Sequence, residues 1–331
     1  MRSSSGRSSR DRAATPDRSC DTRRAARRVT ERLRTLTYEV TGNVARITLD
    51  RPQRGNGITL AMPRELATCV ERADLDPAVH VIALAGKGKG FCGGYDLVES
   101  AEGGMAGLGA GPREGAPPSG SPVDPEVQAR NHDPGETWDP IVDWQMMSRN
   151  VRGFMSLAEC DKPVVCKVHG FCVAGGTDMA LCADLLVIAD DARIGYPPAR
   201  VWGVPTTALW ADRIGAQRAK RLLFTGDLIS GAEAHEWGLA IEAPPAAELD
   251  ERFDALVERI ARLPVNQLVM MKLLVNASLG ERATRTLGTV FDGIARHTKE
   301  GYAFQARAAE AGFKAAVRER DEPFDEPERG G

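Results

Sequence analysis

The sequence predicts an α/β fold with mostly parallel strands, followed by a region that is almost wholly helical. Short apolar runs rich in β-branched residues alternate with segments of helical periodicity, which is typical of parallel strands joined by crossover helices. Glycine-rich stretches separate several of these runs from the next helix, as tight strand-to-helix turns require. From Ala247 onward, apolar stripes recur at helical spacing, so we expect a separate helical layer there.

The individual elements follow from the local pattern in chain order. Residues 37–50 alternate apolar and polar side chains around Gly42-Asn43, which predicts a β-hairpin. Buried strands are expected where short apolar runs occur, at residues 80–85, 163–168 and 185–189. Helices are expected at residues 59–73, 144–158, 176–183, 206–225, 249–263, 265–279 and 282–316, the fourth being broken near Gly215.

The composition is that of an ordinary globular protein. The chain has 331 residues, of which 42% are hydrophobic and 27% charged, enough for a large core and a smaller appended region. No apolar run approaches the roughly 20 residues that cross a bilayer. The seven cysteines include no C-x-x-C pair, and the five histidines show no ligand spacing. We therefore expect reduced, mostly buried thiols in a cytoplasmic protein, and no metal site.

Charge and low-complexity segments suggest the domain organisation. Residues 1–36 carry a net charge of +7, whereas the whole chain carries −3. This arginine- and serine-rich segment is predicted to be a disordered tail. It has no aromatic residues between its arginines, so we do not expect it to bind nucleic acid. We expect a core at 37–246 with a flexible glycine- and proline-rich insertion at about 100–135, a helical region at 247–316, and a disordered tail at 317–331.

Two glycine-centred segments carry the strongest functional signal. They are residues 89–97, KGFCGGYDL, and residues 169–178, HGFCVAGGTD. Each follows an apolar run and precedes a helix-compatible stretch, so each is predicted to form a strand-to-helix turn. N–H groups that open a helix have no partner within it. Two such turns side by side could donate two hydrogen bonds to one oxygen and form an oxyanion hole. The alternative is that the glycines only permit close packing.

These segments resemble the two signature segments of the enoyl-CoA hydratase/isomerase (crotonase) superfamily. The similarity extends over about residues 37–313, and further matches occur in the same order at residues 44–51, 79–85, 195–198, 203–205, 218–226 and 233–239. The resemblance implies a crotonase-like ββα spiral core with a C-terminal all-helical region. It also implies a homotrimer or homohexamer that acts on an acyl-CoA substrate and is not bound to a membrane.

The resemblance further implies the residues of the site. The backbone N–H groups of Tyr95 and Gly175 would form the oxyanion hole. Asp178 would be the general acid/base, at a position where the family commonly has Glu. Implied substrate-binding positions for the coenzyme A thioester are Lys89, Gly90, Phe91, Cys92, Gly93, Gly94, Gly176 and Arg54, with Arg51 and Lys87 as further cations for its phosphates. No separate cofactor is implied.

One position departs from the family pattern. Hydratases of the family have a second Glu in a Gly-x-Pro-Glu segment, where this chain has Pro198. Proline can neither give nor take a proton. Candidates for a second acid are Glu136, Asp139 and Asp143, with solvated loop charges as the alternative. Tyr196 could supply a hydroxyl, although its ordinary pKa near 10 makes it a poor base.

The resemblance implies a lyase, an enoyl-CoA hydratase that converts a 2-enoyl-CoA and water to a 3-hydroxyacyl-CoA, as in fatty acid metabolism. One alternative is an enoyl-CoA or dienoyl-CoA isomerase in which Asp178 shuttles a proton, and Pro198 favours this alternative. A second alternative is a non-catalytic or RNA-binding homologue, which is suggested by the arginines of residues 1–36.

Overall fold

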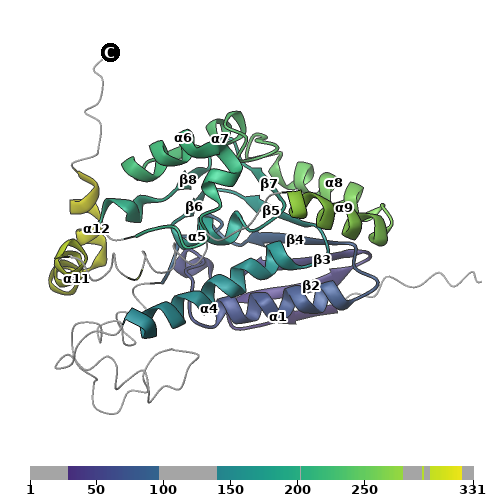
Figure 1. Cartoon of the computed structure of the whole chain (residues 1–331), viewed down its shortest axis with the longest axis horizontal. Coiled ribbons are helices and arrows are strands. Elements are labelled where there is room, and N and C mark those ends of the chain that lie inside the picture. The colour runs from purple at the N-terminus through teal and green to yellow at the C-terminus, as the bar shows by residue number, and fades with distance from the viewer. Residues whose placement is uncertain (1–28, 97–139, 202, 279–292, 294–298, 323–331) are drawn as a thin grey trace, which may run out of the picture.

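The computed structural model describes residues 29–96, 140–201, 203–278, 293 and 299–322 (Figure 1). Residues 1–28 of the expected N-terminal tail and the insertion expected at about 100–135 lie outside the described residues. Glu136 and Asp139 lie outside them as well.

A six-stranded sheet forms the first layer of the core. Its strands are β1 (Val29–Arg32), β2 (Leu36–Thr41), β3 (Val44–Leu49), β4 (Val81–Gly86), β5 (Val164–Val168) and β7 (Leu185–Ile188), in the order β1-β2-β3-β4-β5-β7. The first three strands are antiparallel, and β3 to β7 pair in parallel. The predicted hairpin is confirmed, and Gly42 at its turn has a φ of 59°. The predicted parallel strands are also confirmed.

Strand β1 lies within the segment that was expected to be a disordered tail, so that boundary is wrong. Val29 to Arg32 pair with Val40 to Thr37 of β2. The connection after β1 is held by Glu65, whose carboxylate accepts hydrogen bonds from the backbone N of Arg34 (3.2 Å) and Thr35 (2.9 Å). An available sheet edge and a distant carboxylate thus order residues that are too polar to form a core of their own.

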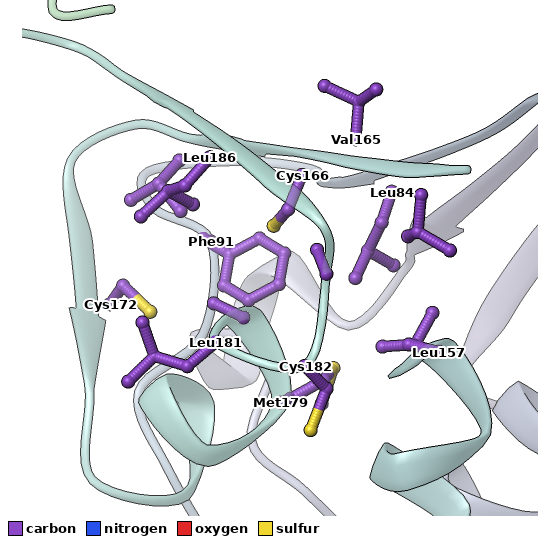
Figure 2. Packing of buried hydrophobic residues seen from close by; sticks show 14 of the residues in the cluster. Leu84, Phe91, Leu157, Val165, Cys166, Cys172, Met179, Leu181, Cys182 and Leu186 are labelled. Carbon is purple, nitrogen blue, oxygen red and sulfur yellow. The ribbon is translucent and has the colours of Figure 1, made fainter. Parts of the chain in front are cut away.

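Helices cover both faces of this sheet. Figure 1 shows α1 (Met62–Leu75) and α4 (Pro140–Glu159) on one side and α8 (Leu249–Ala261) on the other. Apolar side chains fill the space between the sheet and the following turns. In Figure 2 the Phe91 ring lies among Leu84, Cys166 and Leu181, which come from β4, β5 and the residues after α5. All six described cysteines are buried, and none of these six forms a disulfide.

A second, three-stranded sheet continues the ββα spiral. It contains β6 (Phe171–Val173), β8 (Arg193–Gly195) and β9 (Leu228–Ser230), in the order β6-β8-β9. Helix α5 (Gly175–Ala180) follows β6, and η3 (Pro197–Arg200) follows β8. Helices α6 (Trp210–Thr225) and α7 (Gly231–Glu236) complete this part. The break expected at Gly215 is confirmed by its φ of 75°, but the helix begins at Trp210 and not at Thr206.

The described part of the C-terminal region is helical, as predicted, with two differences. Residues 279–292 and 294–298, where a helix was expected from residue 282, and residues 323–331 of the expected tail lie outside the described residues. The described part contains α8, α9 (Val265–Ser278), α11 (Lys299–Ala311) and α12 (Phe313–Asp321). Gly312, with a φ of 86°, interrupts the helix that was expected to continue to residue 316. Residues 317–321 are helical and not disordered, because Asp321 pairs with Arg200 at 3.2 Å. Among the helices of the described residues, none is both long and apolar enough to cross a bilayer.

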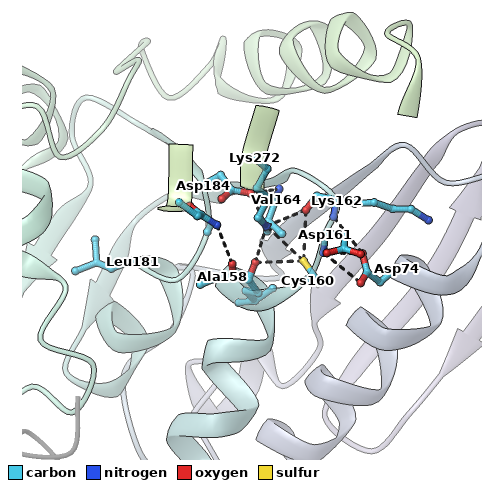
Figure 3. A network of polar contacts seen from close by, with 12 residues as sticks. Asp74, Ala158, Cys160, Asp161, Lys162, Val164, Leu181, Asp184 and Lys272 are labelled. Carbon is cyan, nitrogen blue, oxygen red and sulfur yellow. Dashed lines mark hydrogen bonds and ion pairs between the residues drawn. The ribbon is translucent and has the colours of Figure 1, made fainter. Parts of the chain in front are cut away.

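A buried ammonium group fastens α9 to the core. Lys272 Nζ donates to the carbonyl oxygens of Leu157 (3.2 Å) and Lys162 (2.9 Å), and it pairs with Asp184 Oδ2 at 2.9 Å (Figure 3). Asp184 Oδ2 also accepts from the backbone N of Val164, at 2.7 Å. These contacts join the end of α4, the start of β5 and the residue before β7. A charge removed from water needs such a set of partners.

Candidate active site

The two glycine turns lie side by side. Phe91 N donates to Phe171 O at 2.9 Å, and Val173 N donates to Cys92 O at 3.0 Å. Cys92 and Cys172 form a parallel bridge between them. Because of these bonds, the segment that follows β4 and the segment that follows β5 run parallel to each other as they enter their turns. The sequence prediction that the two segments meet is therefore confirmed.

The two turns are also in close contact at Gly94 and Gly175. A Cβ atom added to Gly94, whose φ is +92°, would lie 2.8 Å from Ala174 Cβ and 3.6 Å from Gly175 N. A Cβ atom added to Gly175 would lie 2.8 Å from Cε2 of Tyr95. Only glycine fits at both positions, since real Cβ contacts are longer. The residues expected to donate to one oxygen are thus neighbours, and the common aim of their N–H groups stays a prediction.

Gly175 is the first residue of α5, so its N–H has no acceptor within that helix. The residue before it, Ala174, has φ 54° and ψ −130°, a backbone conformation that a β-carbon disfavours. Ala174 is held there by its N–H, which donates to Gly195 O at 3.2 Å. Its carbonyl accepts from Thr177 N at 2.9 Å and from Thr177 Oγ1 at 2.7 Å. The second turn therefore has a strained backbone that these hydrogen bonds hold in place.

Asp178 lies one helical turn after the start of α5 and is completely buried, with 0% exposure. Its Oδ1 accepts three hydrogen bonds, from Thr206 N (3.0 Å), Thr207 N (3.3 Å) and Thr207 Oγ1 (3.1 Å). Sequence reasoning missed both threonines, because it assigned them to the first turn of the following helix. A Thr-Thr pair directly after Pro205 was the available signal, since such residues favour turns.

Asn56 supports the first glycine turn and was also missed. Its side-chain amide Nδ2 donates to the carbonyl oxygens of Lys87 (2.8 Å), Gly90 (3.1 Å) and Phe91 (2.9 Å). Its Oδ1 accepts from Arg51 N at 2.9 Å. Asn56 is fully buried and has a φ of 53°, a region that Asn tolerates better than most residues. One side chain thus fixes the strand end from which the first turn departs.

Two of the implied substrate-binding positions have buried side chains. The side chains of Phe91 and Cys92 are both buried in the core, so only their backbone atoms remain as possible contacts for a substrate. The Cys92 Sγ donates to Asn56 O at 3.2 Å, and burial raises the pKa of the thiol to about 12. Cys92 is therefore a protonated thiol at neutral pH. Lys89 and Gly93 are exposed, whereas Gly90, Gly94 and Gly176 are buried.

The cations expected to face phosphates all have carboxylate partners in the chain itself. Arg54 makes a bidentate contact with Asp96, at 3.1 and 2.7 Å. Arg51 pairs with the same carboxylate at 2.9 Å, and Lys87 pairs with Asp50 at 2.8 Å. These ion pairs hold the loop after β3 against the first glycine turn. The sequence shows which residues are cationic, but the partners come only from the fold.

Pro198 lies in η3, where its carbonyl accepts from Gly203 N at 2.8 Å. Tyr196 is buried, and its hydroxyl donates to Val204 O at 3.0 Å, which gives it a structural role in this segment. Of the three candidates for a second acid, Asp143 belongs to α4, but its side chain is not among the described ones. Glu136 and Asp139 lie outside the described residues, so a second acid stays a prediction.

This spiral of ββα units, with two paired glycine turns beside a buried carboxylate, is the crotonase fold. A sequence model of the enoyl-CoA hydratase/isomerase family matches residues 39–114 and 142–323. The chain therefore belongs to the enoyl-CoA hydratase/isomerase family.

Several proteins illustrate the range of its relatives. The crystal structure of an enoyl-CoA hydratase from Mycobacterium smegmatis is 58% identical, with a TM-score of 0.78, and the match covers 88% of this chain and 94% of that one. The 1,2-epoxyphenylacetyl-CoA isomerase of Escherichia coli is 27% identical over 78% of this chain and 86% of its own length. The hydroxycinnamoyl-CoA hydratase-lyase of Pseudomonas fluorescens is 27% identical over 66% and 70%. These relatives differ in the reaction that they catalyse.

Proposed function

We propose that this protein is an enoyl-CoA hydratase that stabilises a thioester enolate with backbone amides. The observation that carries the proposal is the contact of Gly94 and Tyr95 with Ala174 and Gly175, one helical turn from the buried carboxylate of Asp178. The 58% identical protein from Mycobacterium smegmatis is named an enoyl-CoA hydratase, and this supports the choice of reaction.

The proposed reaction adds water across the C2=C3 bond of a 2-enoyl-CoA. Asp178 takes a proton from water, whose oxygen bonds to C3, while the electron pair of the double bond moves toward the thioester oxygen. The N–H groups of Tyr95 and Gly175 would stabilise the charge on that oxygen. Asp178 then returns the proton to C2. Loss of one such donor typically costs about 3 kcal/mol, or roughly a hundredfold in rate.

The second candidate is an isomerase that moves a double bond along the acyl chain. Pro198 at the position of the second acid favours it, because one carboxylate can take a proton from one carbon and return it to another. The resulting enolate would use the same oxyanion hole. The 1,2-epoxyphenylacetyl-CoA isomerase among the relatives supports an isomerase activity in related chains.

One pair of assays separates the two reactions. We expect the purified protein to hydrate a short 2-enoyl-CoA such as crotonyl-CoA, measured as the loss of enoyl-thioester absorbance. The same preparation is then given a 3-enoyl-CoA, and the 2-enoyl product is trapped with an excess of an unrelated hydratase. Migration of the double bond without hydration would replace the first candidate by the second. No turnover of either ester would contradict both.

We also propose that the protein assembles as a homotrimer or homohexamer through α9. Lys272 faces the core, whereas the opposite surface of this helix presents large apolar side chains to solvent. The most exposed is Leu274, at 73%. Several large exposed apolar side chains on one helix are typical of a surface that is buried in an interface. The other exposed apolar side chains of α9 are Met270, Met271, Leu273 and Val275.

We expect Leu274→Lys to shift the protein from an oligomer to a monomer, because the interface would have to bury a charge that has no partner. Light scattering coupled to size-exclusion chromatography measures the mass. Ala255→Lys on the exposed surface of α8 is the matched control and should leave the mass unchanged. A wild-type protein that is already monomeric would contradict the proposed assembly.

A further inference from the structure

We infer that Thr207 is the positioning residue of Asp178, and that Thr206 and Thr207 together fix one oxygen of its carboxylate. Oδ1 is the anchored oxygen, and Oδ2 is the oxygen that exchanges the proton. This inference rests on the proposed function, since it assigns a task to a residue that acts through Asp178. It concerns a segment of the chain that follows η3 and precedes α6, far from α5 in the sequence.

Three donors meet at one oxygen. The consecutive N–H groups of Thr206 and Thr207 both point at Oδ1, at 3.0 and 3.3 Å, and the Thr207 hydroxyl donates to it at 3.1 Å. The next residue, Ala208, has a φ of 54°. Consecutive amides beside a positive-φ residue form a concave anion-binding site. The strained backbone at Ala208 is thus part of a binding site for one carboxylate oxygen of Asp178.

The donors lie where water cannot compete with them. Thr206 and Thr207 are each 1% exposed, and Asp178 is 0% exposed. Burying a carboxylate is costly unless it is hydrogen-bonded, and donors to a charged acceptor are the strong ones. Three donors use the acceptor capacity of Oδ1 and stabilise negative charge on it. Proton transfer therefore falls to Oδ2, with the side chain held in one orientation.

This binding site also accounts for aspartate, in place of the longer glutamate, at position 178. The anchor requires a carboxylate oxygen within 3.0 Å of Thr206 N. One additional methylene would carry the carboxylate past the two amides and would lose the fixed orientation. The shorter side chain is therefore the one that Thr206 and Thr207 can hold. Aspartate extends less far than glutamate, but these hydrogen bonds fix its orientation.

The test compares Thr207→Val with Thr207→Ser, using the acyl-CoA ester that the wild type turns over. Valine keeps the shape and removes the hydroxyl, so we expect kcat to fall by about 10- to 100-fold, as for loss of a hydrogen bond to a charged group. KM should stay within about twofold, because no substrate contact is lost. The acid limb of the kcat–pH profile should move to higher pH, since the carboxylate loses a donor that favours its charged form. Serine should restore most of kcat and the original limb.

Thr35→Val is the matched control. Thr35 is 3% exposed, and its hydroxyl donates to Glu65 Oε2 at 2.7 Å. This is the same kind of contact, made between the connection after β1 and helix α1. The control should lower the thermal midpoint without changing kcat or the pH profile.

Two outcomes would overturn the inference while the wild type remains active. One is a Thr207→Val protein with the wild-type kcat and pH profile. The other is a Thr207→Ser protein as impaired as Thr207→Val, because the shape of the loop and not the hydroxyl would then matter. A wild type that turns over no acyl-CoA ester removes the proposed function itself, and the inference with it.

Discussion

Asp178→Asn should lower kcat by about 100- to 10,000-fold, the contribution typical of a positioned proton-transfer group. Asparagine has nearly the same shape, and its side-chain oxygen can still accept from the amides that now hold Oδ1 at 3.0 and 3.3 Å. The fold should therefore survive while the ability to take a proton is lost. Steady-state kinetics on both esters, with a thermal melt of each protein, measure the two effects separately.

Asp191→Asn provides the control for this change. Asp191 is exposed and follows β7, so its replacement should leave both kcat and the melting temperature unchanged. A rate for Asp178→Asn within about threefold of the wild type would mean that another group carries the proton. Glu136, Asp139 and Asp143 would then be the next residues to replace.

Asn56→Ala should lower the free energy of unfolding by about 5–6 kcal/mol. Three carbonyl oxygens lose a donor and Arg51 N loses its acceptor, at about 1 kcal/mol for each bond. Alanine at a φ of 53° adds about 1–2 kcal/mol of backbone strain. Urea unfolding at one fixed protein concentration measures the loss.

Asn56→Gly isolates the hydrogen bonds from the backbone, because glycine adopts a positive φ without strain. It should remain destabilising, but by about 1 kcal/mol less than alanine. Equal and small losses for the two variants, below about 1 kcal/mol, would show that this side chain does not hold the first glycine turn. Both variants should also lower kcat, because the first glycine turn carries the proposed donor Tyr95 and would be held less firmly.

The parts of the fold that sequence reasoning predicted are those with a local signal. Gly42-Asn43 predicts a hairpin by itself. Gly215 predicts a helix break because glycine readily adopts a positive φ, and its φ in the structure is 75°. Short runs of mostly apolar residues identify β4 and β5 as buried strands. Each of these features depends on neighbouring residues, so no knowledge of the rest of the fold is needed.

The parts that were missed depend on contacts between distant segments. Asn56 bonds to residues 31 to 35 positions away, and Thr207 bonds to Asp178 from 29 positions away. Arg54 has a charge that sequence shows, but its carboxylate partner lies 42 residues further on. Strand β1 exists because an edge of the sheet is open to it. Such pairings are decided by the fold and leave no periodic pattern.

The attachment of α9 has a consequence for communication within the molecule. Lys272 bonds to Asp184, and the carbonyl of that aspartate accepts from Arg213 of α6 at 3.0 Å. Arg213 also donates to Leu181 O at 2.9 Å, directly after the helix that bears Asp178. Lys272, Asp184 and Arg213 thus link α9 to the end of the helix that bears Asp178. We therefore expect the proposed association of subunits through α9 and the proposed reaction at Asp178 to be coupled.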